Sequence, residues 1–246
     1  MPTLAQLAES TAVHLLPQPG YERVVRDEFT YIAGPNNAWV LDPVAADVDW
    51  TRAETRRRGL KLIEWWIGWS APAGLADELL ERGLEPANDP VLTGMTCATE
   101  PPGAPGVDVR PLEKLEEYLA AVAVDWDVWE VPAEERERRL RTETARFEAN
   151  QVAGTVHEWA AYDGGAPVGF GRAIDMADGA ALMGGAVLPS ARGRGIYRAL
   201  VHARWEYAAG RGTPLFVVQA GRMSAPILAG LGFESHGEIR LYADRL

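Results

Sequence analysis

The sequence predicts an α/β protein built on a mixed α+β sheet, and two observations lead to this fold class. Short apolar runs rich in Val, Ile and Trp alternate with amphipathic stretches along the 246 residues, as in proteins whose helices pack on a sheet. A stretch rich in Pro and Gly, residues 99–106, interrupts this alternation. Because such composition is typical of linkers, we expect two domains, at residues 1–100 and 107–246, with a linker at 101–106.

The N-terminal domain is expected to hold a short series of elements. Apolar residues at helical spacing predict a first helix that Pro17 ends, and turn residues at 34–37 separate two β-rich runs into a hairpin. In order, the pattern predicts a helix at 3–16, strands at 23–33 and 38–41, a helix at 49–60, a strand at 62–67, a helix at 73–82 and a strand at 91–97.

The C-terminal domain is expected to follow the order β-α-α-β-β-β-α-β-α-β. Glu and Arg residues at i,i+4 spacing make most of its second helix a solvated face. The predicted elements are a strand at 107–110, helices at 112–124 and 132–149, strands at 156–162, 168–175 and 180–188, a helix from 196 to a C-cap at Gly210, a strand at 215–219, a helix at 225–230 and a strand at 233–242.

The loop after residue 188 carries the strongest functional signal. It joins a buried strand to a helix N-terminus through Arg192-Gly193-Arg194-Gly195. Unpaired N–H groups and the helix dipole favour an anion there, and glycine lets a phosphate approach the backbone. A tight turn with solvated arginines is the alternative. A Walker loop would need Lys-Ser/Thr after the last glycine, and a Rossmann fingerprint would need glycine in place of Arg198.

This stretch resembles the signature of the GCN5-related N-acetyltransferase (GNAT) superfamily. In that signature Val-x-Pro ends a strand and R/Q-x-x-G-x-G/A opens a helix, whereas here the last position holds Tyr197. The resemblance implies that the stretch binds the pantetheine and pyrophosphate of acetyl-CoA, with the tyrosine as a bulky wall beside the phosphates. The residues concerned are Val187, Leu188, Pro189, Arg192, Gly193, Arg194, Gly195, Ile196 and Tyr197.

The resemblance implies a fold for each half of the chain. The C-terminal half would be a GNAT domain, and residues 79–85 in the first half echo residues 228–234 in the second. We therefore expect a tandem protein whose N-terminal half is a shortened, degenerate GNAT-like α/β unit. A chance similarity between two helix caps is the alternative. This unit is expected not to bind CoA, because its Arg56-Arg57-Arg58-Gly59 run stands at the end of a helix.

The family's chemistry is expected at a gap in the sheet, where pantetheine lies along a strand and a backbone N–H polarises the thioester carbonyl. Gly184-Gly185 suits a bulge at that point, or close packing under an aromatic ring. In the second family motif, the positions of an asparagine, an alanine and a general-acid tyrosine hold Gly221, Ser224 and Leu228. The usual acid is therefore absent. Ser224 or water would supply the proton, or Ser224 caps the helix that follows.

Candidates for a general base lie on predicted strands, and each also fits a surface or core polar residue: Glu158, Asp175, His157 and His236. The segment 125–130 is more informative, because Trp126 and Trp129 stand there among carboxylates. Tryptophan beside carboxylate suits a cationic or aromatic amine acceptor, and packing of this loop onto the N-terminal half is the alternative. No cluster has metal-ligand spacing, so we expect no metal.

The composition limits location and partners. A formal net charge of −11 and a pI near 4.9 argue against nucleic acid and anionic membranes and fit a cationic acceptor. Cys97 is the one cysteine, so a disulfide framework within the chain is excluded and a reducing cytoplasm is expected. The start of the sequence has no basic targeting segment, and no apolar run is long enough to span a bilayer.

Two functions from different classes follow. The first is an acetyl-CoA-dependent N-acetyltransferase that moves an acetyl group directly to an amine, expected to be a small molecule, as a monomer or homodimer. The second is a CoA- or acyl-CoA-binding module without transferase activity. The N-terminal half carries five tryptophans, so we expect it to dock tightly on the C-terminal half or to continue its sheet, with both halves bordering the acceptor cleft.

Overall fold

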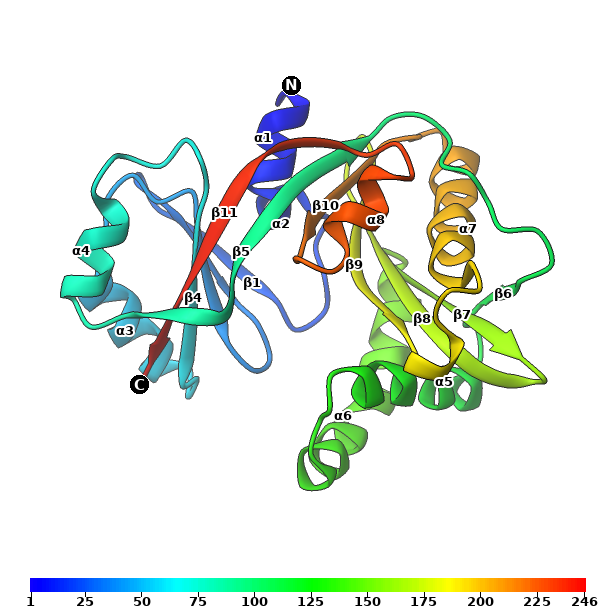
Figure 1. The fold of residues 1–246 in the computed structure, drawn as a ribbon. Coiled ribbons are helices and arrows are strands. Elements are labelled where there is room, and N and C mark those ends of the chain that lie inside the picture. Colours follow the sequence, from blue (N-terminus) through cyan, green and yellow to red (C-terminus); the bar gives the residue numbers. More distant parts are fainter. The chain divides into compact units, whose positions relative to one another are not determined.

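The computed structural model describes residues 1–246, with the side chains of residues 88–90 left out. Contacts between residues divide this chain into two compact units (Figure 1). Unit 1 comprises Met1–His14, Gly20–Thr96 and Val218–Leu246, and unit 2 comprises Leu15–Pro19 and Cys97–Val217. Among the described helices, none combines the length and the apolarity needed to cross a bilayer.

Unit 1 is a sheet with helices. Its strands lie in the order β1-β2-β3-β4-β11-β5, and the neighbours are antiparallel except for β3 and β4. The elements are α1 (Leu4–Glu9), α2 (Thr11–His14), β1 (Glu22–Val25), β2 (Thr30–Ala33), β3 (Ala38–Leu41), α3 (Val48–Arg57), β4 (Leu62–Ile67), α4 (Leu75–Glu81), β5 (Glu85–Cys97), α8 (Ala225–Ala229) and β11 (Glu234–Arg245).

Two predicted elements of this unit are divided in the structure. The single run expected at 23–33 is a hairpin of β1 and β2, because a turn closed by Arg26 N–H donating to the carbonyl of Phe29 (2.9 Å) reverses the chain. The helix expected at 3–16 is two short helices, α1 and α2, which meet at Ser10. Both departures come from turns at short polar stretches, residues 26–28 and 9–11, that interrupt otherwise apolar runs.

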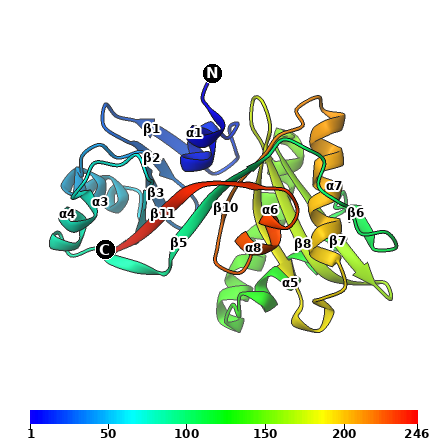
Figure 2. The same ribbon diagram turned by 45° about the horizontal axis from the view of Figure 1, so that its top comes forward.

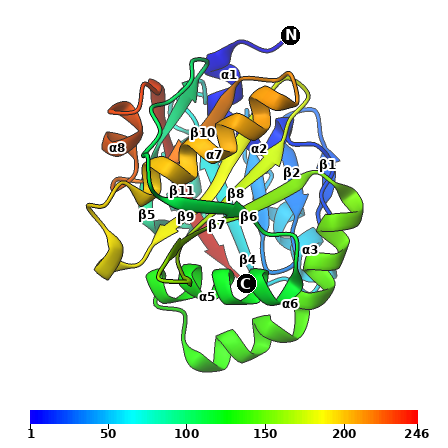
Figure 3. The ribbon, with the colours of Figure 1, turned by 90° about the vertical axis from the view of Figure 1, so that its right-hand side faces the viewer.

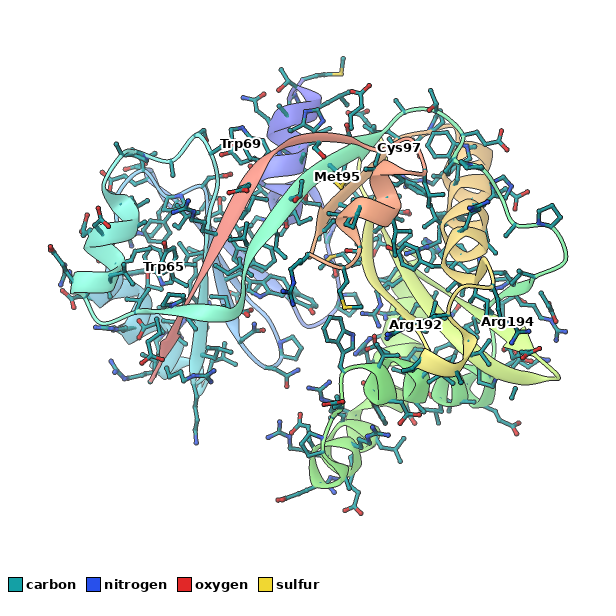
Figure 4. All side chains as sticks on the ribbon, in the orientation of Figure 1. Trp65, Trp69, Met95, Cys97, Arg192 and Arg194 are labelled. Carbon is teal, nitrogen blue, oxygen red and sulfur yellow. The ribbon has the colours of Figure 1, made fainter. Side chains whose placement is uncertain are left out.

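The core of unit 1 is aromatic. Trp65 and Tyr31 are fully buried in it, and Trp50 packs against its edge. Trp69 is 37% exposed, yet its ring lies against two glycines: a β-carbon on Gly94 or Gly237 would come within 2.9 and 2.3 Å of it (Figure 4). Glycine at these positions of β5 and β11 therefore leaves room for the indole ring of Trp69.

The last strand of the chain belongs to unit 1. β11 lies between β4 and β5, with Leu62–Ile67 paired to Arg240–Arg245 on one side and β5 on the other (Figures 1 and 2). Arg52 also ion-pairs with Asp244 at 2.7 Å. The units therefore differ from the domains expected at 1–100 and 107–246, because the pairing partners of the last strand lie far back in the sequence.

Unit 2 is a sheet covered on both faces. Its strand order is β10-β9-β8-β7-β6, antiparallel except for β9 and β10. The elements are β6 (Asp108–Pro111), α5 (Leu115–Val128), α6 (Ala133–Ala153), β7 (Val156–Asp163), β8 (Ala166–Asp175), β9 (Ala180–Val187), a 3-10 turn η1 (Pro189–Ala191), α7 (Ile196–Gly210) and the start of β10 (Phe216–Ala220).

Alternation along β8 explains how the two faces are covered. Phe170 packs in a core with Tyr118 and Phe147 of α5 and α6, whereas Gly169 and Gly171 face α7. Figure 3 shows α7 and the pair α5 and α6 beside this sheet. A β-carbon on Gly171 would lie 3.1 Å from the guanidinium carbon of Arg204, so glycine is what lets α7 lie this close. The helix ends at Gly210 with Arg211 as its C-cap, and the left-handed residue is Gly212 (φ +81°), two residues after the position expected at Gly210.

Candidate active site

The edge of β9 is the opening in the sheet of unit 2. β9 pairs with β10 only at Phe216↔Ala180 and Val217↔Ala181, so within the described residues the edge beyond Ala181 has no strand partner. On the other side, the register with β8 skips Gly184, which is a bulge with φ +67° and open space where a β-carbon would stand. Backbone groups along this edge are thus available to an extended ligand.

The loop that follows β9 forms an uncapped helix N-terminus. Gly193 and Gly195 have φ of +76° and +80°, a conformation that costs side-chain-bearing residues energy. Gly195 is the N-cap of α7 and no side chain caps the helix. The N–H groups of the first turn therefore stay free, and together with the helix dipole they can hold a phosphate.

The two arginines of the loop differ in what they bind. Arg192 Nε donates to the carbonyl of Val187 (3.2 Å), which fastens the loop to the end of β9 (Figure 4). Its charge forms no ion pair among the described residues. Arg194 instead pairs with Asp163 at 2.7 Å, and this guanidinium holds the pKa of Asp163 below its usual range. Arg192 is therefore the cation of this loop that remains for a ligand.

Tyr197, which departs from the family signature, packs against the sheet. The place of a β-carbon on Gly185 lies 3.0 Å from its ring, and burial raises the pKa of the phenol. Gly185 on β9 has no side chain, and this leaves room for the tyrosine ring. The ring expected beside the phosphates therefore packs against Gly185. Of the two interpretations of the glycine pair, Gly184 fits the bulge and Gly185 fits packing under a ring.

The carboxylate expected as a base on β7 is engaged in ion pairs. Glu158 is 7% exposed and binds Arg172 at 2.6 Å, with Arg146 at 3.7 Å. On the α5 side, the hydroxyl of Tyr118 donates to Glu143, which pairs with Arg146 at 3.2 Å. These ion pairs tie Glu158 of β7 to Arg172 of β8 and Arg146 of α6, which gives this carboxylate a structural role.

A second network surrounds Asp175 and His157. The hydroxyl of Tyr207 lies 2.5 Å from His157 Nε2 and 3.1 Å from Asp175, and Arg211 pairs with Asp175 at 2.9 Å. Burial raises the pKa of Tyr207 to about 12, with the Asp175 charge adding to the effect. This cluster lies at the last turns of α7, whereas the glycine loop lies before its first turn. It joins the end of the helix to the sheet.

Asp125 on α5 is a half-buried carboxylate next to Trp129. Burial raises the pKa of this carboxyl, and the charge of Arg172 and a hydrogen bond from Trp129 Nε1 (3.1 Å) oppose the rise. Trp129 is 66% exposed, whereas Trp126 is buried in the core with Tyr118 and Phe147. The two tryptophans expected at the acceptor site thus separate: Trp129 is available to a ligand and Trp126 packs the fold.

The remaining candidates lie in unit 1. His236 Nε2 is 2.7 Å from Thr96 Oγ1 across the β5–β11 ladder. Ser224 precedes α8, but its side chain accepts no hydrogen bond from the N–H groups of the first turn. Its hydroxyl instead donates to the carbonyl of Gly221 (3.2 Å). Ser224 therefore stands at the N-cap position, as expected, but its side chain does not cap the helix. Leu228 is fully buried, and among the described residues no group of His, Cys, Asp and Glu is arranged to hold a metal ion.

Comparison with known proteins gives the family of the second half. Residues 118–233 match the family model described as the acetyltransferase (GNAT) family. This part of the chain is a GNAT domain. The match contains β9, the glycine loop and α7, so the family expected from the sequence is confirmed, and proteins of this family are acyltransferases.

Solved structures extend the likeness to nearly the whole chain. A GCN5-related N-acetyltransferase from Kribbella flavida is 20% identical, with 99% of this chain and 96% of that chain covered and a TM-score of 0.68. A tandem GNAT protein from the clavulanic acid biosynthesis pathway is 16% identical, with 99% and 88% covered and a TM-score of 0.58. At this identity the likeness shows the fold, a two-unit GNAT-like α/β fold. Among curated proteins the sequence has no match.

Proposed function

We propose that the protein is an acetyl-CoA-dependent N-acetyltransferase that acts on a small amine. The observation that supports this most is the combination, in one GNAT domain, of an unpaired β9 edge with the uncapped N-terminus of α7. An extended chain that ends in phosphates fits both features at once. The chain passes directly from the strand edge to the loop through Val187, Leu188 and Pro189, so one extended cofactor could contact both.

The loop residues fit the cofactor chemically. Gly193 has open space where a β-carbon would stand, so a phosphate can reach the backbone. Free N–H groups of Ile196 and Tyr197 in the first turn, together with Arg192, would hold the pyrophosphate. Bound acetyl-CoA supplies an acyl group as a thioester. The bulge at Gly184 leaves backbone groups at the β9 edge to polarise the acyl carbonyl.

Acetyl transfer then needs only a proton acceptor. The amine nitrogen bonds to the acyl carbon, and the C–S bond breaks with its electron pair on sulfur. Asp125 takes the proton that the nitrogen loses, and the thiolate takes one from solvent. A thiolate is a tolerable leaving group because the thiol pKa is ordinarily near ~8.5, so the leucine in place of an acid tyrosine does not prevent the reaction.

The acceptor we propose is a small cationic or aromatic amine. The carboxylate of Asp125 in the last turn of α5 and the exposed indole of Trp129, its C-cap, are joined by a hydrogen bond, and this pairing suits an ammonium group. Unit 1 is not proposed to hold CoA, since Asp47 caps α3 through Trp50 N–H and Asp49 follows in its first turn. The Asp47 carboxylate already binds an N–H group at the helix N-terminus, and the negative charge of both carboxylates would repel a phosphate there. The single thiol, Cys97, fits a cytoplasmic protein.

Binding of CoA by calorimetry tests the proposal. Arg192→Glu should weaken CoA binding at least tenfold, whereas Arg194→Glu should weaken it less, because Arg194 is already paired with Asp163. Equal affinity in wild type and Arg192→Glu would contradict the assignment of the phosphate loop. Free-thiol release from acetyl-CoA across a panel of amines separates the two functions: turnover above hydrolysis supports the enzyme, and tight binding without turnover supports the binding module.

A further inference from the structure

Arg204 is a buried cation without a counter-ion. It lies in α7, is 1% exposed, and forms no ion pair with any described carboxylate. Burial lowers its pKa to about 10, which still leaves it protonated at neutral pH. A buried charge without a partner is costly, and a native structure retains one for a reason. The cost points to a role beyond packing.

The guanidinium joins two strands at the bulge. Its Nη1 donates to the carbonyl of Arg172 on β8 (3.1 Å) and, over 3.5 Å, to the carbonyl of Gly184 on β9. The ladder is interrupted there, because Gly184 is skipped in the pairing of the two strands. Arg204 therefore bridges the strands at the place where they cannot bond each other, and fixes the Gly184 peptide.

One end of this side chain is unused. Nε donates to the carbonyl of Leu200 (2.8 Å), but Nη2 is buried and has no hydrogen-bond partner among the described residues. Among the described residues, Tyr197 is the titratable group with an electrostatic effect on the Arg204 pKa, and its phenol, whose pKa is raised, carries no charge at pH 7. The positive charge at the bulge is thus neither neutralised nor fully hydrogen-bonded.

We propose that Arg204 is a positioning residue for acyl transfer, which holds the Gly184 peptide and supplies the positive charge at the bulge where negative charge develops on the reacting group. The inference rests on the proposed function. As the C–S bond breaks, its electron pair passes to sulfur, and a buried cation close to the β9 edge lowers the energy of that charge more than water would. The incoming thiolate would be the counter-ion that the protein lacks.

The test is the ionisation of the CoA thiol in its complex with the full chain. We would follow thiolate absorbance against pH and subtract the complex with desulfo-CoA. In wild type the thiol pKa should lie about one unit below that of free CoA. Arg204→Met should abolish this shift, Arg204→Lys should keep most of it, and Arg198→Met, an exposed position on the same helix, should leave it unchanged.

Several outcomes would overturn the inference. An unshifted thiol in wild type would do so without any variant, and so would a shift that survives in Arg204→Met. If Arg204→Met does not fold, Arg204→Gln keeps a donor for the two carbonyls without the charge, and its thiol should also be unshifted. Loss of CoA binding by the wild type would contradict the proposed function instead, whereas binding and turnover with an unshifted thiol would contradict only the role of Arg204.

Discussion

At the scale of single residues, environment separates carboxylates that look equivalent in sequence. Glu158 and Asp125 both stand near aromatic residues, but two guanidiniums surround the first, while burial dominates at the second. Glu158 is thereby held in a structural ion-pair network, whereas burial raises the pKa of Asp125. Sequence spacing could not make this distinction, because Arg172 and Arg146 come from different elements.

We predict that Asp125→Asn lowers kcat/KM about 10²-fold or more without lowering stability. The amide keeps an oxygen for the indole of Trp129, but it cannot take a proton. In wild type, kcat/KM should rise with pH as the Asp125 carboxyl loses its proton, at a pH above the ordinary range for aspartate. This rise should be absent in the variant. Rate profiles against pH and thermal unfolding would be measured together.

The stability that Asp125 contributes depends on pH in the opposite direction to that of an ordinary ion-paired aspartate. Because the pKa of Asp125 is raised in the folded protein, the stability it contributes is present at low pH and is lost as pH rises through that pKa. At neutral pH the variant should therefore unfold at the same or a higher temperature. Asp127→Asn, which alters an exposed pair with Arg136, is the control and should change neither property. A loss of folding in Asp125→Asn would contradict the assignment as a base.

Arg204 shows how a residue of the site could have been suspected from sequence. It follows Leu200 by four residues and Ile196 by eight, so it stands on the apolar side of a predicted helix, where arginine is rare. Its function could not have been predicted, because the bulge and the carbonyl groups that it bridges come from β8 and β9. Pattern identifies the unusual residue, and only the fold shows what surrounds it.

At the scale of elements, the strand-loop-helix around residues 180–210 was predictable almost to the residue. An unbroken apolar run, a proline and two glycines are local signals, and the structure forms β9, η1 and α7 in the expected order. Long-range pairing has no such signal. In unit 1, short polar stretches at residues 26–28 and 9–11 turn the chain and divide two expected elements. At the end of α7 the left-handed residue is Gly212 instead of Gly210.

We predict that Gly195→Ala raises KM for acetyl-CoA and costs about 1–2 kcal/mol of stability. The residue has φ +80°, which L side chains adopt at about that cost, and the new methyl would lie 3.1 Å from Ala104. Gly210→Ala is the matched control in the same helix, where nothing lies within 4 Å and helix propensity should give up to about 1 kcal/mol of stabilisation. Unchanged KM and unfolding midpoint in Gly195→Ala would mean that the loop does not need this backbone.

At the scale of the whole molecule, sequence order and spatial units differ. The Pro- and Gly-rich composition of residues 99–106 predicts a domain boundary there, with a C-terminal domain that is complete from residue 107. In the structure β11 completes unit 1 with β4 and β5, which are encoded before that linker. Composition locates a linker but carries no information on which strands pair across it. The pairing of β11 with β4 and β5 could therefore not be predicted from the sequence.

The expectation that the N-terminal half docks on the C-terminal half stays a prediction, and β11 gives it a sharper test. A chain that begins at Pro105 keeps β11 but loses β4 and β5, so both edges of this strand and its apolar residues would be exposed. We predict that this fragment is insoluble, and that it becomes soluble when expressed together with residues 1–104. Solubility and CoA binding of the fragment, alone and with its complement, would be measured. A soluble fragment that binds CoA like the full chain would show that the GNAT domain folds without the strands of unit 1, and that the first half is an independent appendage.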